Sequence, residues 1–109
     1  MATLFTKIIN REIPGDIVYE DDHVVAFRDI VPVAPVHIII VTRAETPGAA
    51  FVPDEGDHMH LINAARKIAE QEGLASYRLV INQGEDAGQS VDHLHMHLLG
   101  GRKLSWPPG

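Results

Sequence analysis

The segment that most constrains this chain runs from Asp92 to Leu99, where three of the seven histidines alternate with apolar residues. Strict alternation is the period of a β-strand with one buried face, so alternate side chains should share a surface while the others pack into the core. The side chains that share the surface are His93, His95 and His97. Imidazole titrates near neutral pH, and its two nitrogen atoms can act separately, one as nucleophile, acid, base or ligand and the other as an anchored donor. The pattern therefore predicts a strand with a chemically active face.

The composition limits the class of protein. A chain of 109 residues with 45% hydrophobic residues can build one core, so we predict a single domain over residues 1–109. The net charge of −6 and the lack of a Lys/Arg cluster argue against a general binder of nucleic acid or anionic membranes. The absence of cysteine excludes disulfides, cysteine-ligated zinc and thiol catalysis. Residues 1–7 contain no apolar signal core, and we expect a soluble cytoplasmic protein.

Hydrophobic spacing predicts an α+β fold with an antiparallel sheet. A short helix is expected from Thr3, its N-cap, to Arg11, and a long helix from about Pro53 to Glu72. The expected core stripe of the long helix is His58, Leu61, Ile62, Ala65, Ile68 and Ala69. Strands are expected over residues 17–20, 24–28, 37–41 and 77–82 and in the histidine segment. Because helices and strands do not alternate regularly, a doubly wound parallel sheet is disfavoured.

A glycine-containing loop, Gly84 to Ser90, directly precedes the histidine segment. Glycines let backbone N–H groups approach a ligand closely, and the Ser90 hydroxyl adds a donor, so such a loop can hold phosphate without Lys or Arg. Together the loop and the histidines indicate a phosphate at the start of the strand. His95 has a histidine on either side and is best placed to attack phosphorus. A covalent phosphohistidine would then split one difficult displacement into two easier ones.

A metal site is the competing interpretation of the histidine segment. Side chains on one face of a strand repeat every roughly 6.6 Å, which separates His93 and His97 by about 13 Å. A tetrahedral site with bonds of about 2 Å does not readily gather all three imidazoles. We therefore expect no metal at these residues.

The other histidines and one acid carry weaker signals. His23, in a turn, and His60, near a helix start, are expected to be surface residues, and His58 a partly buried helix residue. His37 opens an apolar strand, where a structural role fits as well as a functional one. Asp29, at a strand end, fits either a turn acid or a carboxylate that accepts two sugar hydroxyl groups.

Several separated motifs resemble one family, the histidine triad proteins. His93-Leu94-His95-Met96-His97-Leu98-Leu99 is similar to the family's alternating triad, and the preceding residues 87–91 match as well. Further matches occur in order along the chain, at residues 5–9, 12–14, 26–30, 34–37 and 80–82. The ending, Gly100-Gly101-Arg102 through Trp106-Pro107-Pro108-Gly109, resembles the histidine triad nucleotide-binding (HINT) branch. The resemblance covers nearly the whole chain.

The resemblance implies both a fold and an activity. The fold is HIT-like, a five-stranded antiparallel sheet with one short and one long helix, and two subunits form a homodimer whose sheets continue into one. The activity is that of a purine nucleoside phosphoramidase, which hydrolyses the P–N bond of adenosine or guanosine 5′-phosphoramidates. No cofactor or metal is required, and neither nucleic acid nor membrane is a partner.

The resemblance also assigns roles to individual residues. His95 is the nucleophile that forms a nucleotidyl-histidine, His93 and His97 flank it and contact phosphate, and His37 supports the proton network. The remaining assignments concern the nucleotide. Asn82 and Ser90 position the phosphate and the leaving group, and Gly88 and Gln89 line the same loop. Asp29 binds the ribose, Ile30 helps to enclose the base, and Trp106 lies near the other subunit's site.

Two departures and two alternatives accompany this interpretation. The segment Thr42 to Glu45 lacks the proline and histidine usual after His37 in the family, so the rim of the site and the preferred leaving group differ. Asp92 stands where the branch often has an aromatic residue. A dinucleoside polyphosphate hydrolase of the neighbouring branch is one alternative, although the Trp-Pro-Pro-Gly ending argues against it. The other is a nucleotide-binding or scaffold protein in which hydrolysis is incidental.

Overall fold

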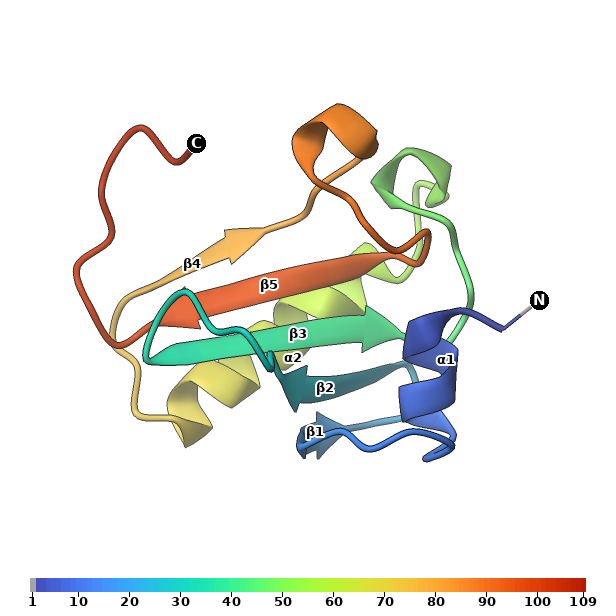
Figure 1. Cartoon of the computed structure of the whole chain (residues 1–109), viewed down its shortest axis with the longest axis horizontal. Helices are drawn as coiled ribbons and strands as arrows, with labels where there is room; N and C mark the ends of the chain where they lie inside the picture. The colour runs from blue at the N-terminus through green and yellow to red at the C-terminus, as the bar shows by residue number, and fades with distance from the viewer. Residues whose placement is uncertain (1) are drawn as a thin grey trace.

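A five-stranded antiparallel sheet organises the computed structural model, which describes residues 2–109 (Figure 1). The strand order is β1-β2-β3-β5-β4, so β3 and β5 lie at the centre and β1 and β4 form the edges. The bounds of the strands are Ile17–Glu20 for β1, Val24–Arg28 for β2, Val36–Thr42 for β3, Tyr77–Val80 for β4 and His95–Gly100 for β5. The predicted α+β class and antiparallel sheet are confirmed.

Two α-helices cover opposite faces of the sheet. Helix α1 spans Leu4–Ile9 and helix α2 spans His58–Gln71, and two short 3-10 turns occupy Ala49–Phe51 and Glu85–Ala87. One core lies under α2 and includes Ile38, Ile40 and Leu98, while the other lies under α1 and includes Ile39 and Val41. Neighbouring residues of β3 thus enter different cores, because successive side chains of a strand point to opposite faces. The uninterrupted apolar run in this strand follows from its burial on both faces.

The register of β3 and β5 sets the position of the histidines. Ile39 pairs with His97 and Val41 pairs with His95, so both histidines lie on the face covered by α1. The alternate residues Leu94, Met96 and Leu98 are buried in the core under α2, as the alternating pattern predicts. His93, in contrast, precedes β5, which begins at His95.

The long helix begins later than the sequence pattern predicts. Residues 54–57 form turns, and α2 starts at His58 instead of near Pro53. Gly56 explains the difference, because a Cβ atom there would lie 2.7 Å from Val52 Cγ2 and 3.0 Å from Pro53 Cδ. The tight turn needs glycine, a residue that also disfavours a helix interior. Two residues that were expected in the core, His58 and Ile62, lie on the solvent-facing side of the helix, and Ile62 is 55% exposed.

Within residues 2–109, no helix combines the length and apolar character needed to cross a lipid bilayer.

Candidate active site

His93 is the buried anchor of the histidine cluster. Its side chain is fully inaccessible to solvent, and both ring nitrogen atoms are hydrogen-bonded. Nε2 lies 2.6 Å from the Thr42 carbonyl oxygen, so this nitrogen carries the proton and donates it. Nδ1 is then the acceptor, and it receives the Thr3 hydroxyl at 2.6 Å. The expected contact of His93 with phosphate does not fit this placement, because neither nitrogen faces solvent.

The backbone of His93 fixes the ring of His95. Nδ1 of His95 lies 2.7 Å from the His93 carbonyl oxygen, and only a protonated nitrogen can make this bond. In the neutral ring, Nε2 therefore holds the free lone pair. Phe5 meets the same ring edge-on, with 4.9 Å between the ring centroids. The site thus orients His95 as a base or nucleophile through Nε2.

A second chain of hydrogen bonds sets the protons of His37 and His97. The Val33 N–H donates to His37 Nδ1 at 3.2 Å, which makes Nε2 the protonated nitrogen of His37. This Nε2 lies 2.9 Å from His97 Nδ1 and 3.4 Å from Asp29 Oδ2. His97 consequently accepts at Nδ1 and, as a neutral ring, carries its proton on Nε2. The cluster presents one histidine as an acceptor and its neighbour as a donor.

Burial keeps these imidazoles neutral. Desolvation lowers the pKa of His95 and of His37 below the ordinary value of 6.5, although the His93 carbonyl and Asp29, respectively, act in the opposite direction. Desolvation, followed by the proximity of His95 and His37, lowers the pKa of His97 to about 4. At neutral pH the cluster therefore holds His95 with an unprotonated Nε2 and His97 as a neutral hydrogen-bond donor.

The glycine loop uses much of its own hydrogen-bonding capacity internally. The N–H groups of Gly88 and Gln89 donate to the carbonyls of Glu85 and Gly84. The Gln89 side chain accepts from the Gly84 N–H and donates to Pro47 and Val91 carbonyl oxygens. These two residues therefore shape the loop, and their N–H groups are not free for phosphate in this conformation. Ser90 lies exposed at the end of the loop.

An apolar cavity of about 230 Å³ lies beside the histidines. Its walls come from α1, the following turn and strands β2 and β3, with Asp29 and Ile30 at one side. Asp29 Oδ1 accepts the Val31 N–H at 2.8 Å, and Ile30 is 94% exposed. Phe5 lines this cavity and also packs against the ring of His95, so this one side chain lies between the cavity and His95.

A second hollow, of about 250 Å³, lies on the other side of His97. It is lined by residues of the sheet and of the chain's end, including His37, Asn82 and Pro108. Asn82 and His97 therefore share a surface, as the sequence motifs suggest. Trp106 is 81% exposed and lies outside the residues that line this hollow.

Among residues 2–109, the potential metal ligands that gather at this site are Asp29, His37 and His97. Their potential ligand atoms lie within 4.8 Å of one another. The three triad histidines cannot chelate an ion together, because both nitrogen atoms of His93 are occupied by Thr3 and Thr42.

Sequence patterns did not reveal the support of the triad by distant residues. Thr3 caps α1, as predicted, by accepting the Thr6 N–H, but its hydroxyl also reaches His93. The Glu45 carboxylate accepts from the Thr3 N–H and the Thr6 hydroxyl, which ties the start of α1 to the segment after β3. The one sequence feature that pointed to this support was the set of polar residues in the atypical Thr42–Glu45 segment.

Comparisons with known proteins agree with this architecture. The crystal structure of a HIT family hydrolase from Legionella pneumophila superposes with a TM-score of 0.91 at 45% identity, covering 99% of this chain and 100% of that chain. The fold and site are therefore those of a histidine triad domain. The HIT domain model matches residues 10–104, and the chain belongs to this family.

Two relatives of known sequence are similar over almost all of the chain. One is an uncharacterised HIT-like protein of Synechococcus elongatus, 54% identical over 112 residues, with 98% of this chain and 96% of that protein covered. The other, from Arabidopsis thaliana, is named Adenylylsulfatase HINT1 and is 46% identical over 112 residues, with 98% and 76% covered. The chain is thus HINT-like.

Replacing Thr3 tests the hydrogen bond to His93. Thr3→Val removes the hydroxyl group that donates to His93 Nδ1, and it also removes the N-cap of α1. We expect the free energy of unfolding to decrease by about 1–3 kcal/mol. Thr3→Ser keeps the hydroxyl and should stay within about 0.5 kcal/mol of the unmodified chain. Urea unfolding followed by circular dichroism measures both. Equal stability of the two variants would contradict the anchoring role.

The neutral histidines predict a pH dependence of stability. The folded-state pKa of His97 lies near 4 and the unfolded value near 6.5, so between these pH values the unfolded chain binds more protons. The free energy of unfolding should therefore decrease as pH falls from 6.5 to 4, by at most about 1.4 kcal/mol per pH unit for this histidine. Urea unfolding at several pH values should show a shallower decrease for His97→Asn, and identical slopes would refute the prediction.

Proposed function

We propose that this chain is a hydrolase of purine nucleoside 5′-phosphoramidates that works through a nucleotidyl-His95 intermediate. The observation that carries the proposal is the 2.7 Å bond from His95 Nδ1 to the His93 carbonyl, which leaves Nε2 as a buried, unprotonated nucleophile. Membership of the HIT family and similarity to a protein described as a HIT family hydrolase support hydrolysis in general.

The first step forms the covalent intermediate. His95 Nε2 donates its lone pair to phosphorus, the P–N bond to the substrate amine breaks, and the amine leaves with the proton of His97 Nε2. The His95 ring becomes positively charged during attack, and the His93 carbonyl accepts its Nδ1–H, which stabilises that charge. The Ser90 hydroxyl is a further donor that we assign, together with His97 Nε2–H, to the phosphate and the departing amine.

The second step restores the enzyme. Water attacks phosphorus, the bond between phosphorus and His95 Nε2 breaks, and the nucleoside monophosphate is released. The proton of the water returns to His97 Nε2, which supplied the proton of the amine, while the other nitrogen of His97 is held by His37 at 2.9 Å. The sum of the two steps is phosphoramidate and water to monophosphate and amine.

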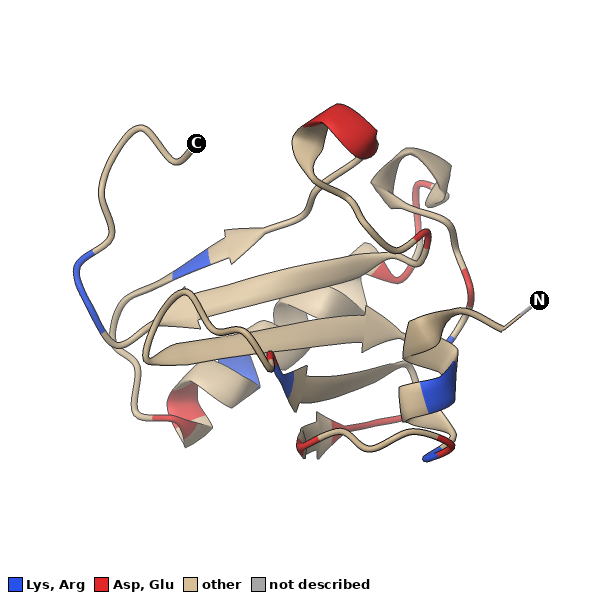
Figure 2. Ribbon diagram, viewed as in Figure 1, with Lys and Arg blue, Asp and Glu red and all other residues tan. Residues whose placement is uncertain are grey.

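The phosphate would be held without cationic side chains. Neither β3 nor β5 contains Lys or Arg, and Figure 2 shows both central strands free of charged residues. Neutral N–H and O–H donors can bind phosphate through their dipoles, which suits a chain of net charge −6.

The nucleoside fits the apolar cavity beside His95. We assign the base to the cavity wall that includes Phe27, Ile30 and Ile39, and the ribose to the Asp29 carboxylate at its side. Asp29 Oδ1 already accepts the Val31 N–H, which fixes the carboxylate for a sugar hydroxyl at its remaining lone pairs. Asn82 and Ser90 are assigned to the phosphate and the leaving group.

A nucleoside phosphosulfate is a second candidate substrate. The relative named Adenylylsulfatase HINT1 favours it, because its name indicates hydrolysis of adenylyl sulfate. The same attack by His95 would break the P–O bond to sulfate. Sulfate leaves without needing a proton, whereas an amine requires one, so the two substrates place different demands on His97. A dinucleoside polyphosphate is the further alternative, and its leaving group, a nucleotide, is also an anion.

We also propose a homodimer in the cytoplasm. Strand β4 is an edge of the sheet. Tyr77, at its start, is 39% exposed, and Ile81, directly after its end, is 36% exposed. An exposed edge strand offers unpaired backbone groups that a second copy can extend. Pairing of β4 with its counterpart would join two sheets into one and bring Trp106, 81% exposed in the single chain, toward a second subunit.

The role of His95 is tested by its replacement with alanine. Turnover of an AMP-amine phosphoramidate should fall by at least about 10⁴-fold, because the nucleophile is lost, while AMP binding is retained. A phosphoramidate labelled in its AMP group should form an acid-labile adduct with the unmodified chain only. Turnover by His95→Ala at the unmodified rate would refute the assignment.

His97→Gln is the matched comparison for the leaving group. It keeps a polar side chain but removes the ring that donates a proton, so hydrolysis of the phosphoramidate should fall by more than hydrolysis of adenylyl sulfate. Equal losses on both substrates would contradict the proton-donating role of His97.

The homodimer predicts a molar mass twice the 12.0 kDa of the chain. Sedimentation equilibrium at micromolar concentration measures it. Ile81→Asp places a charge beside the edge strand and should shift the mass toward that of a single chain, whereas Asp22→Asn, at the opposite edge, should not. A mass of one chain for the unmodified protein would contradict the proposal.

A further inference from the structure

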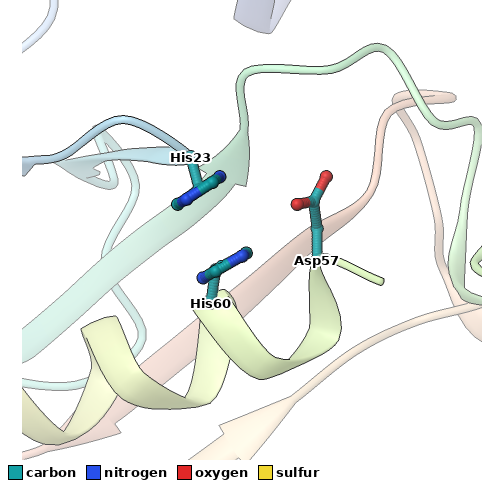
Figure 3. Close-up of side chains that lie close together, drawn as sticks. All are labelled: His23, Asp57 and His60. Atoms are coloured by element: carbon teal, nitrogen blue, oxygen red, sulfur yellow. The ribbon is translucent and has the colours of Figure 1, made fainter. Parts of the chain in front are cut away.

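A second cluster of potential ligands lies outside the histidine triad. His23 comes from the turn between β1 and β2, and Asp57 and His60 come from the start of α2 (Figure 3). The two imidazole rings stack face to face, with 3.6 Å between centroids and an angle of 3° between planes. One potential ligand atom from each of the three residues lies within 4.8 Å of the others.

We propose that His23, Asp57 and His60 bind a divalent transition-metal ion of the zinc class. Two imidazole nitrogens and one carboxylate oxygen suit Zn²⁺, whereas Mg²⁺ and Ca²⁺ prefer oxygen ligands. Tetrahedral Zn²⁺ with bonds of about 2 Å brings its ligand atoms to about 3.3 Å from one another. Because the lone pair of each nitrogen lies in the plane of its ring, the two stacked imidazoles must turn out of their parallel arrangement to direct both lone pairs at one ion, and His23 is exposed and His60 partly exposed. Three protein ligands leave a fourth position for water.

The carboxylate of Asp57 is available for this role. Asp57 is the N-cap of α2, a position where an aspartate side chain commonly accepts an N–H of the first turn. Its side chain makes no such hydrogen bond, and its backbone carbonyl instead accepts the Leu61 N–H. Asp57 and His60 are three residues apart, which places both on one side of the helix.

The turn that carries His23 is rigidly held. The Asp21 carboxylate accepts the N–H groups of His23 and Val24 at 2.8 and 2.9 Å, as well as the Tyr19 hydroxyl. The Arg43 N–H donates to the His23 carbonyl. These bonds use the backbone of His23 and fix where its ring is presented. A ligand whose backbone is already fixed loses less conformational entropy when it binds an ion.

Local charge favours a cation at this position. The N-terminus of a helix carries a partial positive charge, which by itself would repel a metal ion. Asp54 and Glu55 stand directly before α2 and, together with Asp57, offset that charge. All three acids and both histidines line one open hollow of about 600 Å³, which gives an ion and its water access.

The cluster is separate from the proposed catalytic residues. His60 belongs to α2, which packs on one face of the sheet, whereas His95 and His97 lie on the face covered by α1. The ion would therefore link the β1–β2 turn to the first turn of α2 without contact with the triad. Because the ion would bind the folded chain and not the unfolded one, it should raise the thermal stability.

Zn²⁺ titration by calorimetry tests the site in the chelator-treated, dialysed protein. We expect one Zn²⁺ per chain, and His23→Gln or His60→Gln should weaken its affinity by at least about tenfold. Zn²⁺ at about 100 times the dissociation constant should raise Tm by about 10 °C in the unmodified chain. Co²⁺ as a probe should give the visible absorption of a tetrahedral site, and Mg²⁺ should not compete.

Three variants make the outcome decisive. His58→Gln removes an exposed histidine from the same hollow, and His97→Gln disrupts the Asp29–His37–His97 group, so both should keep the Zn²⁺ affinity of the unmodified chain. Asp57→Asn should weaken binding and abolish the tetrahedral absorption of Co²⁺. Loss of binding in His97→Gln alone, equal weakening by His58→Gln, or no binding at millimolar Zn²⁺ would each overturn the proposal. Circular dichroism shows whether every variant folds.

Discussion

The hydrogen bonds of one fully buried imidazole connect most parts of this structure that matter for its site. Nε2 of His93 donates to the carbonyl of Thr42 at the end of β3, and Nδ1 accepts from Thr3 at the start of α1. The carbonyl of the same residue orients His95 at the start of β5. Because a buried imidazole without partners is costly, the requirement to satisfy one ring ties β3 to α1, and the carbonyl of the same residue adds β5. The ring of His95 is thus oriented by the backbone instead of by a mobile side chain.

The proton positions at the site follow from carbonyl and N–H groups of the backbone. The His93 carbonyl requires a proton on Nδ1 of His95, and the Val33 N–H requires a lone pair on Nδ1 of His37. His97 is set in turn through His37. Carboxylates take little part in this arrangement, since Asp29 lies farther from His37 than His97 does. The imidazoles of His37, His95 and His97 therefore stay neutral at physiological pH, because burial lowers the pKa of each ring.

The sequence predicts the parts of this fold that depend on local patterns. Alternation places Leu94, Met96 and Leu98 in the core, and the β-hairpin over residues 17–28 has the predicted strands. The long helix begins late because Gly56 is needed in a close turn, which periodicity does not detect. The hydrogen bond from Thr3 to His93 and the stacking of His23 on His60 join residues far apart in the chain. No local pattern contains such contacts, so they required the structure.

The position of Thr3 has a consequence for handling this protein. The residue that holds the buried imidazole is itself fixed by Glu45, whose carboxylate accepts the Thr3 N–H. A peptide attached close to Thr3, or cleavage of the chain beside it, alters the surroundings of a side chain that is two hydrogen bonds away from the His95 ring. An affinity tag is therefore better placed away from this residue, and measurements on proteins that differ beside Thr3 are not interchangeable.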